Sequence, residues 1–426
     1  MKIPNAISIR VSKIIQKNQF VKDILQSIEN RSGRVLLVGG AVRDLFLDLP
    51  IKDLDFEVYG LTLDQLQAVL QVYGVVSLIG KSFGVLRLHG LDVDWSLPRK
   101  DSQGRHPVVA YDPNMSYEQA FARRDVTINA MGIVMNTMEL IDPFDGLHDL
   151  ECKILRSPDL DFFEQDPLRL LRVMQFVGRF TMVVDEQLSQ LCSTIDMTKV
   201  SQERIEQEFR KLFLQAQKPS LGLQWLMKIG KFNEFLPEIK DDQKLLTTID
   251  IAACKKYASD EEKIVVMWAV ILAQVNLPKI KDSFEHVTRS EKQPYIDFIR
   301  RIHHHDLIIR QVVACVVYSP KLVHEITDAQ LKWLAVWLAP ELSIRTFLCF
   351  MEIIIGESCV KIFFDHAHKI GVLDFPEQPL LTGKDFLEFA QGVQLGVLVK
   401  KSYEIQIDKN IIDKNELKKM VLENQD

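Results

Sequence analysis

The sequence predicts an α+β domain followed by an all-α remainder, and two patterns support this fold class. Up to about residue 150, short β-rich runs alternate with helical stretches and are separated by Gly and Pro. From residue 166 onward, strand signals nearly vanish and apolar residues recur at helical spacing. The chain has 426 residues, of which 47% are hydrophobic and 26% charged, so it can bury the cores of two or more domains.

The elements of the first part follow from its alternating apolar residues. We expect strands at residues 34–38, 54–59, 75–79, 84–89 and 91–97, with helices at 41–47 and 63–72. The segment 98–113 is largely polar and contains Gly104 and Pro107, which predicts a mobile loop. These elements predict a mixed β-sheet with helices packed on it.

The second part shows the helical period throughout. Its clearest apolar stretches cover residues 168–180, 205–214, 221–229, 264–275 and 331–350. None of them reaches the length of a membrane span, so we expect no membrane association. The N-terminal residues carry no apolar run of signal-peptide length, and the six cysteines show no CxxC spacing, which predicts reduced thiols in the cytoplasm.

Two glycines follow the first predicted strand. Gly39 and Gly40 precede a predicted helix, so the backbone there could approach a phosphate, and Arg43 could clamp the same anion. Taken alone, two glycines more often make only a tight connection between a strand and a helix.

Acidic residues then alternate along two predicted strands. Asp53 and Asp55 are two residues apart, so both carboxylates face one side of a strand, where they could hold Mg²⁺. On a later strand Asp94 alternates with Val93 and Trp95 and could supply a third carboxylate. For each segment alone, an acidic outer face remains an alternative.

A second polar cluster follows the predicted loop. Arg123 and Arg124 could bind a triphosphate, while Asp125 and Asn129 could accept hydrogen bonds from ribose hydroxyls. An N-capped helix with a solvated charged start is the alternative interpretation.

A third cluster begins a predicted helix with Asp166 as N-cap and Pro167 in its first turn. Arg169 and Arg172 lie on roughly the same helical face as Asp166. A carboxylate beside a guanidinium could recognise the amino group and ring nitrogen that cytosine and adenine share, and so reject uracil and guanine. The alternative is an intrahelical ion pair with Asp166 committed to capping.

In this order and spacing, the clusters resemble the class II tRNA nucleotidyltransferase (CCA-adding) and bacterial poly(A) polymerase family, within the polymerase β-like superfamily. The resemblance is dense from about residue 36 to 180 and assigns roles to the quoted residues. It implies catalytic carboxylates at Asp53, Asp55 and Asp94, with Mg²⁺ at the first two. It further implies nucleotide and phosphate binding by Gly39, Gly40, Arg43, Arg99, Arg123, Arg124, Asp125 and Asn129, and base selection by Asp166, Arg169 and Arg172.

The resemblance also implies the architecture and the reaction. We expect a helical extension at 1–33, a nucleotidyltransferase head at 34–157, a helical neck at 158–230, and a tRNA-binding body and tail at 231–426. The implied reaction adds C and A from CTP and ATP to the 3′ end of tRNA at its acceptor arm, in the cytoplasm, with no DNA partner expected. A net charge of −6 requires that any RNA-binding surface be local. The alternatives are a poly(A) polymerase, a partial CC- or A-adding enzyme, and an inactive RNA-binding relative.

The chain departs from the family pattern at several places. Gln165 stands where Glu is usual, and Gln175 where Arg is usual. Residues 245–275 resemble the HD phosphohydrolase region of some relatives but lack its paired His and His-Asp residues, so that activity is expected to be absent. The cluster His303, His304 and His305 is interpreted as a polar surface patch, because adjacent side chains on a helix do not converge on one ion.

Overall fold

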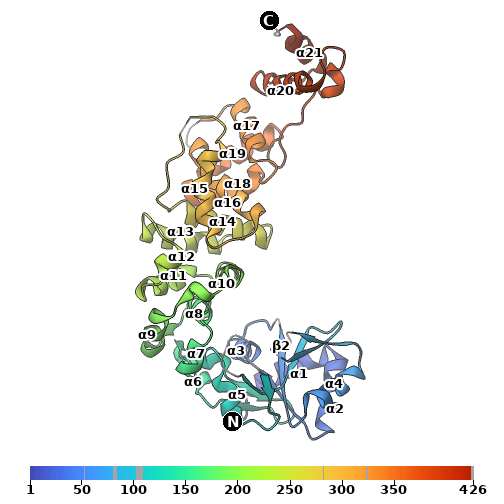
Figure 1. Ribbon diagram of the computed structural model, residues 1–426, viewed down its shortest axis with the longest axis vertical. Helices are drawn as coiled ribbons and strands as arrows, with labels where there is room; N and C mark the ends of the chain where they lie inside the picture. The colour runs from blue at the N-terminus through green and yellow to red at the C-terminus, as the bar shows by residue number, and fades with distance from the viewer. Residues whose placement is uncertain (52, 80–83, 102–108, 282, 323–324, 424–426) are drawn as a thin grey trace. The chain divides into compact units, whose positions relative to one another are not determined.

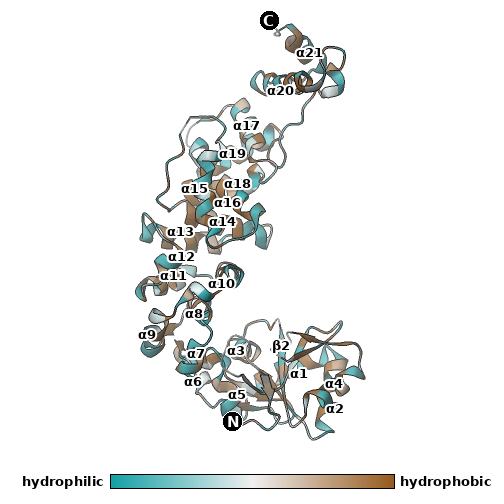
Figure 2. Ribbon diagram, in the orientation of Figure 1, coloured by the Kyte–Doolittle hydropathy of each residue, from teal (hydrophilic) through white to brown (hydrophobic). Residues whose placement is uncertain are grey.

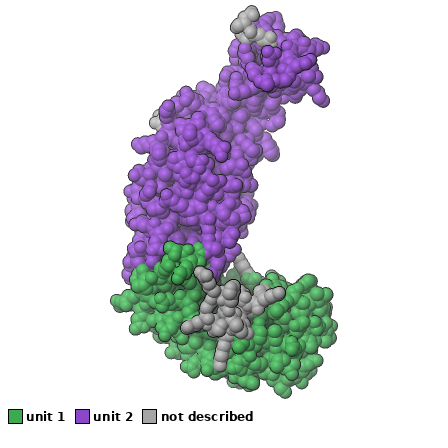
Figure 3. Space-filling model, viewed as in Figure 1, with its two compact units in different colours: residues 1–200 green, residues 201–426 purple. Residues whose placement is uncertain are grey.

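The computed structural model describes residues 1–51, 53–79, 84–101, 109–281, 283–322 and 325–423 (Figure 1). The chain divides into two compact units, Met1–Val200 and Ser201–Asp426 (Figure 3). All strands of the described residues belong to the first unit, and the second unit is helical. This confirms the predicted fold class, while the boundaries expected for head, neck, body and tail stay predictions.

The first unit is built on a seven-stranded mixed sheet with the order β3-β4-β5-β2-β1-β8-β9. Its strands are β1 (Arg34–Val38), β2 (Leu54–Tyr59), β3 (Val76–Ile79), β4 (Val85–Leu88), β5 (Val93–Ser96), β8 (Gly132–Val134) and β9 (Glu139–Ile141). Strands β2 and β5 pair in parallel, and the other neighbours pair antiparallel. All five predicted strands occur. Strands β8 and β9 were not predicted, because three residues are too few to display a period.

Helices complete the first unit around this sheet. They are α1 (Asn5–Gln16), α2 (Gln19–Glu29), α3 (Gly40–Phe46), α4 (Leu63–Gln71), α5 (Tyr117–Ala122), α6 (Gly146–Cys152), α7 (Leu160–Glu164), α8 (Arg169–Phe180) and α9 (Glu186–Thr194). Short 3₁₀ turns follow at η1 (Thr127–Asn129) and η2 (Met197–Lys199), and β10 (Ile154–Leu155) pairs with β11 (Val183–Val184). In the core, Phe56 of β2 stacks on Trp95 of β5 with ring centroids 4.8 Å apart.

Two expectations for this unit need correction. The segment 98–113 is not a loop throughout, because β6 (Arg99–Asp101) pairs with β7 (Val109–Tyr111); residues 102–108 lie outside the described residues. Helix α8 begins at Arg169 rather than directly after Asp166. Pro167 has no N–H to donate. The first turn is closed by hydrogen bonds that span three residues, as in a 3₁₀ turn, such as the one from the Arg169 N–H to the Asp166 carbonyl.

The second unit consists of helices α10 (Gln202–Gln215), α11 (Pro219–Lys228), α12 (Phe232–Phe235), α13 (Asp242–Cys254), α14 (Asp260–Leu272), α15 (Arg289–Arg300), α16 (Asp306–Tyr318), α17 (Asp328–Leu338), α18 (Ile344–Ile355), α19 (Glu357–Lys369), α20 (Gly392–Asp408) and α21 (Lys414–Glu423), with 3₁₀ turns η3 (Ser319–Leu322) and η4 (Gly383–Phe386). Helix α14 is buried on all sides from Ile264 to Leu272 and packs against α10, α13, α16 and α18. Figure 2 colours much of this group as hydrophobic. The apolar stretch 331–350 forms two helices instead of one, because Pro340 interrupts it.

The expectation that the histidine cluster lies on a helix is wrong, and only His304 and His305 are exposed as a surface patch requires. Residues 303–305 lie in a non-helical segment between α15 and α16, and His303 is only 1% exposed. Burial lowers the pKa of His303 to about 4, with smaller contributions from His305 and His304, so this ring is neutral at pH 7.

No helix among the described residues is both long and apolar enough to cross a membrane.

Candidate active site

Strands β2 and β5 bring two predicted catalytic carboxylates together. In their parallel register Asp55 lies opposite Asp94, and the next residues along, Phe56 and Trp95, also lie opposite one another. Successive side chains of a strand point to opposite faces, so the aromatic pair enters the core while the acids face outward. Asp55 and Asp94 line a pocket of about 270 Å³ in the first unit.

The carboxylates of this pocket repel one another. Burial raises the pKa of Asp55 above its ordinary value, and the charges of Asp94 and Asp53 raise it further, against the opposing effects of Arg124 and Arg87. Asp53 itself precedes β2 and is exposed, so it acts on Asp55 from outside the strand. A bound cation would relieve this repulsion, and the hard oxygen donors suit a divalent ion.

Arg87 and Glu57 were missed by sequence reasoning. The Arg87 guanidinium holds Asp94 through two contacts of 2.6 Å, from Nε and Nη2 to Oδ1. Glu57 lines the pocket two residues after Asp55, is 8% exposed, and accepts a 2.5 Å hydrogen bond from the Tyr59 hydroxyl. The alternation of Asp53, Asp55 and Glu57 along one strand was the available signal.

Three arginines line the same pocket. Arg99, Arg123 and Arg124 line it together with the acids. Arg124 lies 3.5 Å from Glu57 and over the ring of Phe121, and its Nε is buried without a hydrogen-bond partner in the described structure. Arg123 donates to the Arg99 carbonyl and lies over the ring of Phe162. A pocket lined by both carboxylates and guanidiniums can bind a metal-complexed polyphosphate.

Gly39 makes room for one of these arginines. Its φ of 72° lies in the region that favours glycine, and a Cβ there would come within 2.8 Å of Arg124 Nη1. Gly40 begins α3, and a Cβ on it would lie 3.3 Å from Arg43 Nη2. The glycines thus follow β1 as predicted, and Gly39 sets the position of Arg124.

Three of the predicted nucleotide-binding residues lie in a buried polar network. Asn129 accepts a 2.6 Å hydrogen bond from Arg43 Nη1 and donates one of 3.0 Å to Asp125. Asp125 also binds the guanidinium of Arg172 at 2.7 and 2.5 Å. Arg43 is further paired with Asp44 at 2.7 Å and lies over the rings of Phe176 and Phe180 on α8. This network joins α3 and η1 to helix α8.

The predicted base-selecting residues surround the start of α8. Asp166 Oδ1 accepts a hydrogen bond from Leu168 N–H, as a cap would. Arg169 donates to the carbonyls of Phe162 at 2.9 Å and Arg123 at 2.7 Å and lies over the Phe162 ring. Arg172 pairs with Asp125. Asp166, Arg169 and Arg172 therefore lie near one another but contact different groups. Gln175, one of the departures from the family pattern, is 1% exposed and accepts a hydrogen bond from Arg179.

Family comparisons agree with this arrangement. Residues 35–156 match the family described as Poly A polymerase head domain, and residues 186–243 match the one described as Probable RNA and SrmB-binding site of polymerase A. The Multifunctional CCA protein of Haemophilus ducreyi is 35% identical over 217 residues, covering 48% of this chain and 51% of that protein. Its counterpart in Pseudomonas putida is 30% identical over 255 residues, covering 57% and 66%.

Solved structures share the fold along nearly the whole chain. The Bacillus stearothermophilus CCA-adding enzyme in complex with CTP has a TM-score of 0.71 at 18% identity, covering 94% of this chain and 95% of its own. The Thermotoga maritima CCA-adding enzyme complexed with tRNA has a TM-score of 0.63 at 19% identity, with 98% of each chain covered. Nucleotidyltransferases with this head domain are generally metal-dependent. The chain spans about half the length of the first curated relatives it matches, and its residues 35–156 carry the Poly A polymerase head domain.

Proposed function

We propose that this protein adds C and A from CTP and ATP to the 3′ end of tRNA without a template. The observation that carries the proposal is the pocket in which Asp55, Asp94 and Glu57 face Arg99, Arg123 and Arg124. Acids can hold cations while guanidiniums bind a triphosphate, which is what nucleotidyl transfer requires. The names and ligands of the similar proteins support tRNA, CTP and ATP as partners, and a tRNA substrate implies a cytoplasmic site of action.

The metal-binding residues we propose are Asp55 and Asp94, with Asp53 beside them. The donor set fits Mg²⁺, because its oxygens are hard ligands whose mutual repulsion already raises the pKa of Asp55. Magnesium held there would supply positive charge next to the RNA 3′-hydroxyl, the α-phosphate and the departing pyrophosphate. Arg87 keeps the Asp94 carboxylate in place through its paired contacts.

The remaining pocket residues bind and orient the nucleotide. Arg99, Arg123 and Arg124 neutralise the triphosphate oxygens, and Gly39 leaves the space that Arg124 occupies. Asp125 and Asn129 act as positioning residues, because their hydrogen-bonding groups are already engaged with Arg43 and Arg172. This role replaces the ribose contacts that the sequence suggested for them.

Base selection is proposed for the start of α8. The carboxylate of Asp166 and the guanidinium of Arg169 can together bind the amino group and ring nitrogen shared by cytosine and adenine. The contacts of Arg169 with the Phe162 and Arg123 carbonyls support a fixed guanidinium plane, which reading a base edge needs. Arg172 keeps α8 attached to the network through Asp125.

The proposal is tested by offering the purified protein three tRNAs, ending before CCA, after C and after CC, with each labelled nucleotide supplied separately. We expect C on the first two substrates, A only on the third, and no extension of a complete CCA end. A long A tail would instead identify a poly(A) polymerase, and addition of C alone or A alone a partial enzyme. Failure of all additions by a protein that still binds tRNA would identify an inactive relative.

A further inference from the structure

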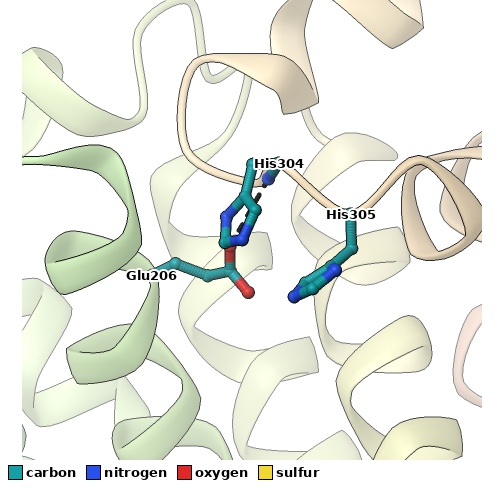
Figure 4. A group of neighbouring side chains, drawn as sticks. All are labelled: Glu206, His304 and His305. Atoms are coloured by element: carbon teal, nitrogen blue, oxygen red, sulfur yellow. Dashed lines mark hydrogen bonds and ion pairs between the residues drawn. The ribbon is translucent and has the colours of Figure 1, made fainter.

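A cluster outside the nucleotidyltransferase pocket has the composition of a metal site. Glu206 of α10, His304 and His305 each offer one ligand atom, and these atoms all lie within 4.8 Å of one another. Figure 4 shows the Glu206 carboxylate and the two imidazoles gathered at one point. The glutamate comes from a helix, whereas both histidines come from the segment between α15 and α16.

The carboxylate of this cluster is buried and held in a defined orientation. Glu206 is 7% exposed, and its Oε1 lies 3.2 Å from Nε2 of the buried His303. His303 Nδ1 accepts a hydrogen bond from the His305 N–H, so Nε2 carries the proton that faces Glu206. An imidazole that orients a ligating carboxylate in this way is typical of the second layer around metal sites.

The two other ligands are accessible. His304 Nδ1 lies 2.6 Å from Glu206 Oε2, and the His304 side chain is 39% exposed. His305 is also exposed, and its ring lies 4.2 Å from that of His304 between centroids. The segment that carries both rings is tied to α10, because Gln202 Nε2 donates to the carbonyls of Arg300 and His303.

The charge balance favours a cation at this point. Burying the carboxylate of Glu206 costs free energy that a divalent ion would offset. Arg210 of α10 is engaged with Glu261 at 3.0 Å, and Arg300 is engaged with Asp306 at 2.9 Å. Two imidazoles and one carboxylate, with a fourth position open to water, form a ligand set that binds Zn²⁺ in preference to Mg²⁺.

We propose that Glu206, His304 and His305 form a binding site for Zn²⁺ or a similar divalent transition metal, which joins α10 to the segment between α15 and α16. Binding would require the ligating nitrogens of both histidines to be free of protons. The site differs from the pocket of the first unit in ligand type, since it uses nitrogen donors. It does not depend on the proposed nucleotidyl transfer.

The direct test is Zn²⁺ binding to the full chain after chelator dialysis, measured by competition with a chromogenic chelator in excess Mg²⁺. One tight equivalent is expected. His304→Ala and His305→Ala should each lower the affinity for Zn²⁺ by at least roughly 100-fold. Losing a residue that only orients a ligand already lowers metal affinity by up to about this factor, and losing the ligand itself should cost at least as much. His368→Ala, which removes an exposed histidine elsewhere in the second unit, should bind like the wild type.

Co²⁺ provides a signature that a merely structural effect would not produce. The wild type and Asp55→Asn should both show the intense visible bands of four-coordinate Co²⁺, and His304→Ala should lose them. His305→Cys should restore binding and add a thiolate charge-transfer band, which shows that the variants still fold. Absence of a tight equivalent, binding that survives the double His304→Ala, His305→Ala change, or bands that vanish with Asp55→Asn would overturn the proposal.

Discussion

Two acidic residues of the first unit, the half-buried Asp55 and the buried Asp125, have pKa values shifted in opposite directions. Burial raises the pKa of each, and around Asp55 the charges of Asp94 and Asp53 raise it further. Around Asp125, the charge of Arg172 and hydrogen bonds from Asn129, Arg172 and the Val126 N–H outweigh burial and lower the pKa to about 2. The charge of Asp125 is therefore stabilised by groups of the chain itself, whereas neighbouring carboxylates oppose the charge of Asp55. Acids held without enough partners are typical of functional sites.

The largest effect that would test this contrast is expected from Asp55→Asn. Nucleotide addition should fall at least about 100-fold, because metal charge supplies several kcal/mol and about 1.4 kcal/mol corresponds to a tenfold change in rate. Without metal, the melting temperature should equal or exceed that of the wild type, because the amide removes the repulsion from Asp94. Asp92→Asn, which neutralises an exposed acid just before β5, is the control and should change neither quantity. Near-normal turnover of Asp55→Asn with Mg²⁺ would remove the metal assignment.

Asp125→Asn should show the opposite behaviour, with loss of stability. We expect the free energy of unfolding of the first unit to fall by about 2 kcal/mol, since hydrogen bonds to a charged group are weakened and Arg172 loses its counter-charge. The measurement is urea denaturation, with Asp161→Asn as an exposed acidic control. An unchanged midpoint would show that the network does not stabilise the fold.

The stabilisation that Asp125 provides should depend on pH. The folded pKa of Asp125 is lowered from 3.8 to about 2, so its contribution is complete above pH 4 and is lost as the pH falls toward 2. The wild type should therefore lose more stability than Asp125→Asn across that window. Parallel acid-unfolding curves for the two proteins would contradict the assignment.

Arg169→Ala tests whether the start of α8 reads the base or only supports the pocket. If Arg169 reads the base, kcat/KM on a trimmed tRNA should fall roughly tenfold more for CTP and ATP than for UTP and GTP. Losing its hydrogen bonds to the Phe162 and Arg123 carbonyls would instead lower all four values equally. Arg179→Ala, on the same helix, is the matched control. A uniform fall would end the base-reading role.

The smallest effect is expected from Gly39→Ala. Its Cβ would displace Arg124, so KM for CTP should rise a few-fold while kcat changes less. The backbone of Gly39, with φ 72° and ψ −137°, also strains an alanine by about 1 to 3 kcal/mol. Gly90→Ala separates the two effects, because Gly90 has a φ of 81° and open space around its Cβ, so it should show the strain without the change in KM. Equal kinetics for the two variants would show that Gly39 does not position Arg124.

The sequence by itself determined the local features of this protein. Period-two alternation predicted β2 and β5, and the helical period predicted the all-α second part, because side-chain direction follows directly from backbone repeat. The order and spacing of its polar clusters also predicted the resemblance of the first part to polymerase head domains, which the family match over residues 35–156 confirms. Short elements escaped prediction, as β8 and β9 show, since three residues carry no measurable period.

Only the tertiary structure decided which groups share a site. The parallel register of β2 and β5 sets Asp55 opposite Asp94, and no local pattern specifies which strands become neighbours. The fold also places Asp125 and Asn129, for which the sequence predicts ribose contacts, in a hydrogen-bonded network with Arg43 and Arg172. The fold also brings Glu206 of α10 next to His304, which lies 98 residues away in sequence. In each case the deciding quantity is distance in space between residues remote in sequence, and local backbone preferences cannot determine it.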